Sequence, residues 1–277
     1  MRMKLRASLV ISLTAAAALS LAACSGSSST SATSSAAASS SAAAPSTDAA
    51  SSSASASVDA KAALQAANAK TQAAGSANVS TETLVGFGTQ NRSVSSTGVR
   101  NFAKEESQVE VTFNDGAKAT EIITKQYAYI QTAESNKGWY QVGISDDTPS
   151  VVDGQSLLKI IPDLQNVTVD GTETLNGVAT TRYTATLAPE LALSFSGLSS
   201  EERTQLAEKL TDAKSSGLAY WVDDEGRIVR ASHVAAFTAK EIGSIGTAIT
   251  VSFSNFGVTT EIKVPTEDQL VQRPETQ

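Results

Sequence analysis

The sequence predicts an α+β fold, in which one long antiparallel β-sheet of about ten strands carries helices on one face. From residue 78 onward, short segments with alternating apolar and polar residues follow one another, and hairpin signals such as Asn114-Asp115-Gly116 separate them. Two or three helical patterns interrupt these segments, without the regular strand–helix alternation of a parallel sheet. Since a twisted sheet of this size tends to curl, helices across its concave side leave either a packed core or a cavity.

The N-terminal end has the layout of a secretory signal peptide. Three basic residues within the first six precede an apolar run from Ala7 to Leu21, and small residues then lead to Cys24. A small-small-cysteine junction resembles the bacterial lipobox, in which the thiol is diacylated and the preceding segment is removed. We therefore expect residues 1–23 to be a lipoprotein signal peptide and Cys24, the only cysteine in the chain, to be the lipidation site. The alternative is a plain secreted protein with an incidental cysteine.

Acylation predicts where the mature protein lies. Each buried methylene contributes about 0.8 kcal/mol, so two or three acyl chains hold a protein firmly at the outer face of the cytoplasmic membrane. After the cysteine, residues 24–58 are almost entirely Ser and Ala, a composition that buries too little apolar area to fold. We expect a disordered linker with a reach on the order of 30 Å between the membrane and the folded domain, residues 59–277.

The charge balance argues against nucleic acid as a partner. The chain has 21 basic and 28 acidic residues. Removing the three cations of the signal peptide leaves 18 against 28, a net charge of −10. An acidic domain is a poor ligand for nucleic acid and has no polybasic patch for anionic lipid headgroups. The lipid on Cys24 is therefore expected to be the membrane anchor.

The folded domain is predicted to begin with a helix and a run of hairpins. Asp59 is a plausible N-cap for a helix over residues 60–74, and Gly75 ends it. The apolar positions of this helix are mostly Ala with a single Leu64, which requires close packing against something flat. The strands expected next share an alternating apolar pattern, and they cover residues 78–87, 94–102, 109–113, 119–124, 127–132 and 138–142.

The second half repeats the pattern with two more helices. A short apolar helical segment over residues 157–164 contains Pro162, which limits its length. A second helix is expected to open with the capping-box pattern Ser199-x-x-Glu202 and to end near Ala213. The strands predicted here cover residues 167–173, 180–187, 218–222, 228–237, 248–256 and 258–264, with turns at Asn176-Gly177 and at Asp223 to Gly226.

Enzymatic motifs are weak, and no catalytic residue, cofactor or metal site is predicted. His233, the only histidine, lies in a predicted strand, where a histidine is usually a hydrogen-bonded filler, and no nucleophile motif accompanies it. Zinc lacks the necessary His and Cys ligands. The acidic turn at Asp223 and the pair Asp146-Asp147 lack the ligand spacing of a calcium loop.

Motifs along most of the domain resemble a known family. They include Lys137-Gly138-Trp139-Tyr140, the segment from Asp170 to Gly177 with Thr181-Arg182-Tyr183, the segment from Trp221 to Arg227, and the segment from Val251 to Gly257. Together with the lipobox and the polar linker, these residues look like actinobacterial lipoproteins of the LppX/LprG group within the LolA-like superfamily. The resemblance implies a curved antiparallel half-barrel of about ten or eleven strands with helices packed on its concave face. It also implies an acylated envelope lipid or lipoglycan as the ligand and an envelope transporter as a candidate partner.

A carrier of this kind must hide an acyl chain whose transfer through water costs on the order of 12 kcal/mol. The apolar stretch from Leu191 to Leu198 is the most telling candidate lining, because exposed loops are rarely so apolar. The alternative is a non-enzymatic scaffold or protein-interaction module, in which these residues are ordinary core; a hydrolase comes third. The residues predicted to line the cavity are Leu157, Leu158, Ile161, Leu191, Leu193, Phe195, Leu206 and Leu210.

Overall fold

A computed structural model describes residues 56–87, 90–135, 138–144, 152–187, 192, 195, 200–208, 210–240 and 243–272. The predicted signal peptide, Cys24 and most of the predicted linker lie outside the described residues. Within the described part, no helix has the length and apolar character needed to cross a membrane.

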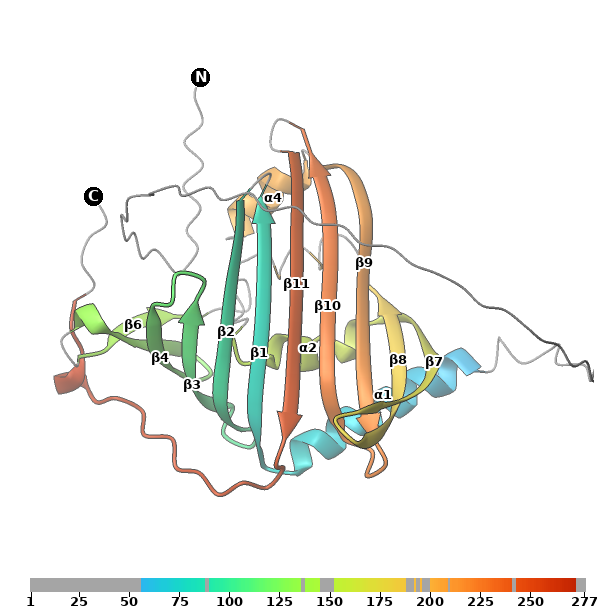
Figure 1. Ribbon diagram of the computed structural model, residues 1–277, viewed down its shortest axis with the longest axis horizontal. Helices are drawn as coiled ribbons and strands as arrows, with labels where there is room; N and C mark the ends of the chain where they lie inside the picture. The colour runs from blue at the N-terminus through green and yellow to red at the C-terminus, as the bar shows by residue number, and fades with distance from the viewer. Residues whose placement is uncertain are drawn as a thin grey trace, which may run out of the picture.

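The domain is built on one open, curved antiparallel sheet of eleven strands, in the order β6-β5-β4-β3-β2-β1-β11-β10-β9-β8-β7 (Figure 1). The first and last strands therefore pair in the middle, and each joins a meander that runs outward to an edge. The predicted fold class, an α+β half-barrel with helices on the concave face, is confirmed. The strands are β1 Ser76–Phe87, β2 Gln90–Asn101, β3 Glu106–Phe113, β4 Lys118–Ile123, β5 Tyr127–Thr132, β6 Tyr140–Gly143, β7 Gln165–Leu175, β8 Val178–Thr186, β9 Leu210–Asp223, β10 Ile228–Ala239 and β11 Gly243–Ser254.

The hairpin turns form where the sequence supplies residues that accept positive φ. Asn176 and Gly177, between β7 and β8, have φ values of 52° and 84°. A type I′ turn requires positive φ at both central positions, and Asn-Gly meets this requirement at the lowest cost. The register of this hairpin is therefore set by the turn predicted from the sequence.

Helix α1, Ala56–Ala73, packs on the inner face of the sheet, which is the face that carries the helices (Figure 1). Leu64 is fully buried, and the buried Ala60 and Ala67 lie one turn to either side of it. Small alanine side chains let the helix approach the sheet closely, as the composition of the helix predicted. The helix begins before the predicted Asp59 cap, and Gly75 follows its end with φ 79°.

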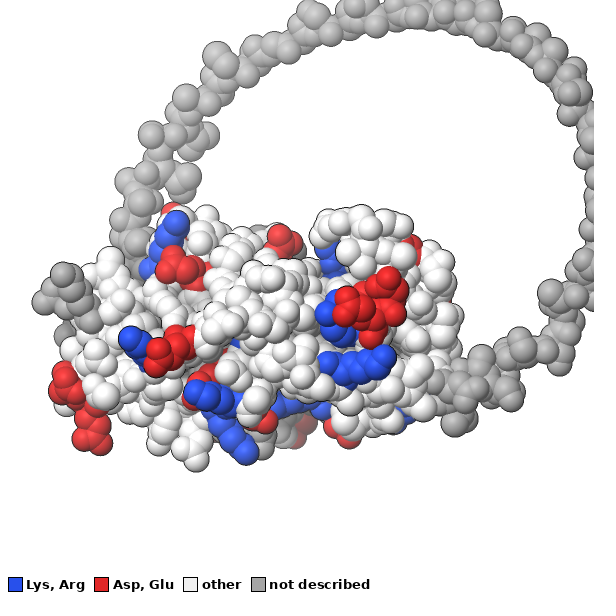
Figure 2. Space-filling model, turned by 90° about the horizontal axis from the view of Figure 1, so that it is seen from below, with Lys and Arg blue, Asp and Glu red and all other residues white. Residues whose placement is uncertain are grey.

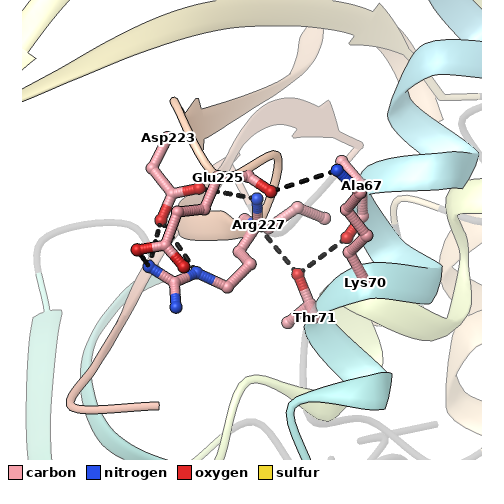
Figure 3. A network of polar contacts seen from close by, with 7 residues as sticks. Ala67, Lys70, Thr71, Asp223, Glu225 and Arg227 are labelled. Atoms are coloured by element: carbon pink, nitrogen blue, oxygen red, sulfur yellow. Dashed lines mark hydrogen bonds and ion pairs between the residues drawn. The ribbon is translucent and has the colours of Figure 1, made fainter.

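Polar contacts fix the C-terminal end of α1 to the turn between β9 and β10 (Figure 3). The Thr71 hydroxyl donates to the Ala67 carbonyl at 2.8 Å and accepts from the backbone N–H of Ile228 at 2.8 Å. Lys70 Nζ donates to the Glu225 carbonyl at 3.2 Å. In the same turn, Arg227 forms ion pairs with Asp223 and Glu225, each at 2.8 Å. The acidic turn is thus held by cationic side chains of this chain.

The other helices are short. The predicted helical segment 157–164 is divided into two elements, helix α2, Gln155–Lys159, and the 3₁₀ turn η2, Ile161–Asp163. Pro162 lies in η2, shortly after the α-helix has ended. The described 3₁₀ turns also include η1 Ala133–Ser135 and η4 Glu267–Gln269. Helix α4 covers Ser200–Ala207.

The predicted extension of the second helix to Ala213 is wrong. From Leu210 onward the chain belongs to β9, so the strand predicted over residues 218–222 is much longer. The segment from Thr211 to Gly217 is rich in Ser, Thr, Asp and Gly, which are weak helix formers. Pairing with β10 then decides its conformation, because Leu210 lies opposite Ala239.

The predicted last strand over residues 258–264 is also wrong. Strand β11 already pairs with β1 on one side and β10 on the other, so no free edge remains beside it. The chain instead runs along one end of the sheet toward β6, where Leu270 forms a parallel bridge with Trp139 (Figure 1). On the way, Ile262 packs with Ile122 and Tyr129 in a small second core.

Replacing Leu64 by Ala should destabilise the domain by about 2–5 kcal/mol, because it leaves a cavity between α1 and the sheet. Replacing the neighbouring, exposed Gln65 by Ala is the matched control and should change stability by less than about 0.5 kcal/mol. Urea denaturation measures both. Equal, small effects would contradict the docking of α1 described above.

Candidate functional site

The candidate site is the inner face of the sheet and the layer that covers it. Side chains along each strand alternate between the two faces, and those on the inner face merge with α1, α2 and η2 into one continuous apolar core. Of the residues predicted to line a cavity, five lie in this core and are buried, namely Leu157, Leu158, Ile161, Phe195 and Leu206. The structure therefore brings these five together inside the half-barrel.

The other three predicted lining residues are not placed there by the structure. Leu191 and Leu193 lie outside the described residues. Leu210 is the first residue of β9 rather than part of a helix, and its side chain is not described. Leu206 and Leu210 do not share a helical face, because the helix that was predicted to continue to Ala213 ends at Ala207. That these residues bind a ligand remains a prediction.

Hydrogen bonds to backbone carbonyls hold α2 and η2 across the interior. The buried Tyr220 hydroxyl of β9 donates to the Leu157 carbonyl at 2.8 Å, and burial raises the pKa of this phenol. From α1, Asn68 donates to the Leu158 carbonyl at 3.2 Å and Lys61 to the Leu164 carbonyl at 2.9 Å. A sheet strand and a helix thus fix this short segment from two sides.

A buried ion pair anchors the start of α2. Arg100 of β2 contacts Asp153 at 2.5 Å, with both side chains almost fully enclosed. The Ser107 hydroxyl donates to the same carboxylate at 3.0 Å, and the Gln155 backbone N–H donates to its other oxygen at 3.2 Å. Gly154 follows with φ 68°, and a Cβ there would come within 2.3 Å of a Val251 methyl. Only glycine fits this junction, which is why α2 begins where it does.

Glu121 of β4 is a second buried acid on the inner face. Burial, and next the negative charge of Asp153, raise its pKa from 4.5 to about 7. Near neutral pH this carboxyl therefore holds a proton in a large share of the molecules.

His233 is fully buried on the inner face of β10. Its Nε2 lies 3.3 Å from the Ser216 hydroxyl, and its ring lies 4.7 Å from the Phe195 ring, centroid to centroid. Burial lowers its pKa to about 4, so the imidazole is neutral at physiological pH. The sequence predicted a hydrogen-bonded histidine in this strand, and Ser216 is its hydrogen-bond partner.

Three buried threonines on the inner face were not singled out by the sequence analysis. Thr81 and Thr83 lie on β1 and Thr247 on β11, and none of their hydroxyls has a hydrogen-bond partner within the described part of the chain. The alternation of residues along β1 already predicts that Thr81 and Thr83 share the face of the apolar Val79. It does not show that Thr247 lies beside them, because it does not reveal which strand pairs with β1.

The outer face carries a different feature. A shallow hollow of about 330 Å³ lies where β1, β2, β3 and β11 adjoin, lined by residues such as Glu82, Leu84, Ser95 and Thr250. None of the predicted lining residues belongs to it.

The charged side chains form no large patch of one sign on the face seen from below. There, acidic and basic side chains lie next to one another between broad areas of uncharged surface (Figure 2).

Comparisons with known proteins show similarity to solved structures only. No family model matches the chain, and no curated protein matches it. The lipoprotein LppX of Mycobacterium tuberculosis is 19% identical, with 73% of this chain and 98% of that chain covered and a TM-score of 0.44. LprF of Mycobacterium bovis is 16% identical, with 76% and 98% covered and a TM-score of 0.44. A LolA superfamily protein of Nitrosomonas europaea is 11% identical, with 76% and 99% covered and a TM-score of 0.32.

The buried Glu121 predicts a pH dependence of stability. The unfolded carboxyl ionises near its ordinary pKa of 4.5, whereas the folded one keeps its proton until about pH 7. The free energy of unfolding should therefore fall as the pH rises from about 4.5 to about 7, by on the order of 3 kcal/mol from this group.

The Glu121→Gln variant isolates this contribution. His233 acts in the opposite sense, because its lowered pKa makes stability fall as the pH drops from 6.5 toward about 4. The difference in free energy of unfolding between the variant and the parent protein removes the histidine contribution. In denaturant titrations the variant should gain relative stability as the pH rises from 4.5 to 8. A difference that stays constant with pH would show that the folded carboxyl titrates normally.

Proposed function

We propose that the protein is a membrane-anchored envelope lipoprotein that holds the acyl chains of a lipid or lipoglycan between its curved sheet and the inner helices, for transport or retention. The observation that carries this proposal is the continuous apolar interior of an open half-barrel. This interior extends from Val109 and Ile123, on β3 and β4, to Val167 on β7. The chemistry of the interior is that of a binding protein, and no catalytic step is proposed.

The geometry suits a long flexible ligand. Helices α1 and α2 pack against strands β7 and β10, and the inner layer around them consists of short segments rather than a second sheet (Figure 1). This layer is not joined to the sheet by a ladder of backbone hydrogen bonds, so an acyl chain can lie between the two without breaking strand pairing. An acyl chain that enters there gains about 0.8 kcal/mol for each methylene removed from water.

A filled core is the second candidate, and one observation favours it. Leu157, Leu158 and Ile161 are fully buried by other residues of the chain itself. In that case the fold would serve as an envelope scaffold or protein-interaction module. The two candidates differ in whether the interior accepts added volume.

Anchoring through Cys24 is tested by replacing this residue with Ser in the full-length chain. The acyl chains are expected on the thiol, so the parent protein should sediment with membranes and incorporate labelled palmitate. The Cys24→Ser variant should incorporate none and should keep residues 1–23, because removal of the signal peptide follows acylation of the cysteine. Incorporation of label by the variant, or salt release of the parent protein, would contradict lipid anchoring.

The bound lipid is tested by enlarging Ala235, a buried inner-face residue of β10 that lies opposite Thr247 and Ser216. The parent protein, purified in full length from an actinobacterial host, should release a lipid in native mass spectrometry. Ala235→Phe should lose that lipid and keep the fold, because the ring occupies volume that the chain would fill. Ala236→Phe, on the opposite face of the same strand, is the matched control and should retain the lipid.

A filled core predicts a different result from the same variants. Overpacking a tight interior costs about 1–3 kcal/mol, so Ala235→Phe would then be destabilised relative to Ala236→Phe. A parent protein that carries no lipid and takes up none from micelles would overturn the carrier function and favour the scaffold.

A further inference from the structure

Four polar side chains form a contiguous group on the inner face, which we name the hydroxyl row: Thr81 and Thr83 of β1, Thr247 of β11 and His233 of β10. Their exposed fractions are 1%, 7%, 3% and 0%, respectively. They lie on the face that also carries apolar core residues such as Val79 and Ile249.

The strand register places these side chains side by side. Thr83 and His233 both lie directly opposite Ile249, on its two neighbouring strands. Thr247 lies two residues before Ile249 and therefore on the same face, diagonal to both. Side chains in these relations are immediate neighbours, because opposite residues are about 5 Å apart and diagonal ones about 7–8 Å apart. The hydroxyl row thus surrounds one apolar side chain at the centre of the sheet.

The polar atoms of the row lack partners. In the described part of the chain, the three threonine hydroxyls and Nδ1 of His233 form no hydrogen bond. A buried polar group without a partner costs about 1–3 kcal/mol, and the large majority of buried polar groups in folded proteins are paired. Valine has nearly the shape of threonine and would avoid this cost. Four unpaired atoms at one place therefore point to a hydrogen-bonding partner that is not part of the chain.

We propose that the hydroxyl row is a polar subsite that receives the hydroxyl and ester oxygens of the lipid, a refinement that rests on the proposed function. Threonine hydroxyls donate and accept, and a neutral imidazole offers one donor and one acceptor. These groups suit uncharged oxygens. The charges of Arg100 and Asp153 in the same interior are occupied by each other. The ligand class is accordingly an uncharged acyl ester or hydroxylated lipid rather than a free fatty acid or a plain hydrocarbon.

Two probes with the same number of chain carbons test the subsite: monopalmitoylglycerol, which carries an ester and hydroxyls, and hexadecane, which carries no oxygen. The full-length protein is incubated with both in micelles and re-isolated, and the bound molecules are quantified by mass spectrometry. The parent protein should prefer monopalmitoylglycerol. The double variant Thr83→Val/Thr247→Val should lose this preference by about tenfold or more, as expected when a neutral hydrogen bond is removed.

Two controls separate the subsite from general effects on the fold. Thr112→Val/Thr250→Val changes two threonines at outward positions of β3 and β11 and should leave the preference unchanged. The inner double variant should also have a higher melting temperature without lipid, because it removes two unpaired buried hydroxyls.

The possible failures are distinguishable. If the parent protein binds neither probe, the proposed lipid-binding function is wrong. If it binds both probes and the inner double variant keeps the parent's preference, the subsite is wrong while lipid binding stands. In that case enclosed water, rather than lipid, is the partner of the hydroxyls.

Discussion

The pairing of β1 with β11 is the constraint on which the rest of the structure depends. These strands, near the two ends of the folded chain, share a register of ten residue pairs in the middle of the sheet. Without this contact, the chain would consist of two separate meanders, β1–β6 and β7–β11, each with an unprotected edge. The pairing joins their apolar faces into one curved surface. It also brings together inner-face side chains that are far apart in sequence, including Thr83 and Thr247.

The buried pair of Arg100 and Asp153 determines how that surface is covered. A buried ion pair contributes little net stability, but removal of one partner leaves a costly isolated charge. Its value here is positional, because Asp153 immediately precedes the glycine junction at which α2 begins. The strand meander of β1–β6 thus holds, through Arg100, the helical segment that packs against the other meander. The two halves are coupled across the interior as well as through the sheet.

The sequence patterns predicted the features that depend on neighbouring residues, such as strand positions, hairpin turns and helix ends. Alternation located most strands, Asn176-Gly177 marked a hairpin turn, and Gly75 marked the end of α1. The predictions were wrong where the pairing of strands far apart in the chain, rather than the local sequence pattern, decides the conformation. The residues from Leu210 onward form β9 because β10 offers a partner, whereas residues 258–264 have strand-like composition but no free edge beside β11. For the site, burial of Leu157 and Phe195 followed from their apolar character, but the threonines could be recognised only with the register in hand.

The interior departs from what stability alone would favour. An acid with a raised pKa, a histidine with a lowered one and several unpaired hydroxyls are enclosed by an otherwise apolar core. Each feature costs free energy, and isosteric apolar residues would remove much of that cost. Such departures from locally favourable choices tend to concentrate at functional sites. Here the unpaired atoms of Thr81, Thr83 and Thr247 lie on two adjacent strands of one face, beside His233 on a third. That clustering on one face is the observation that supports the proposed polar subsite inside the half-barrel.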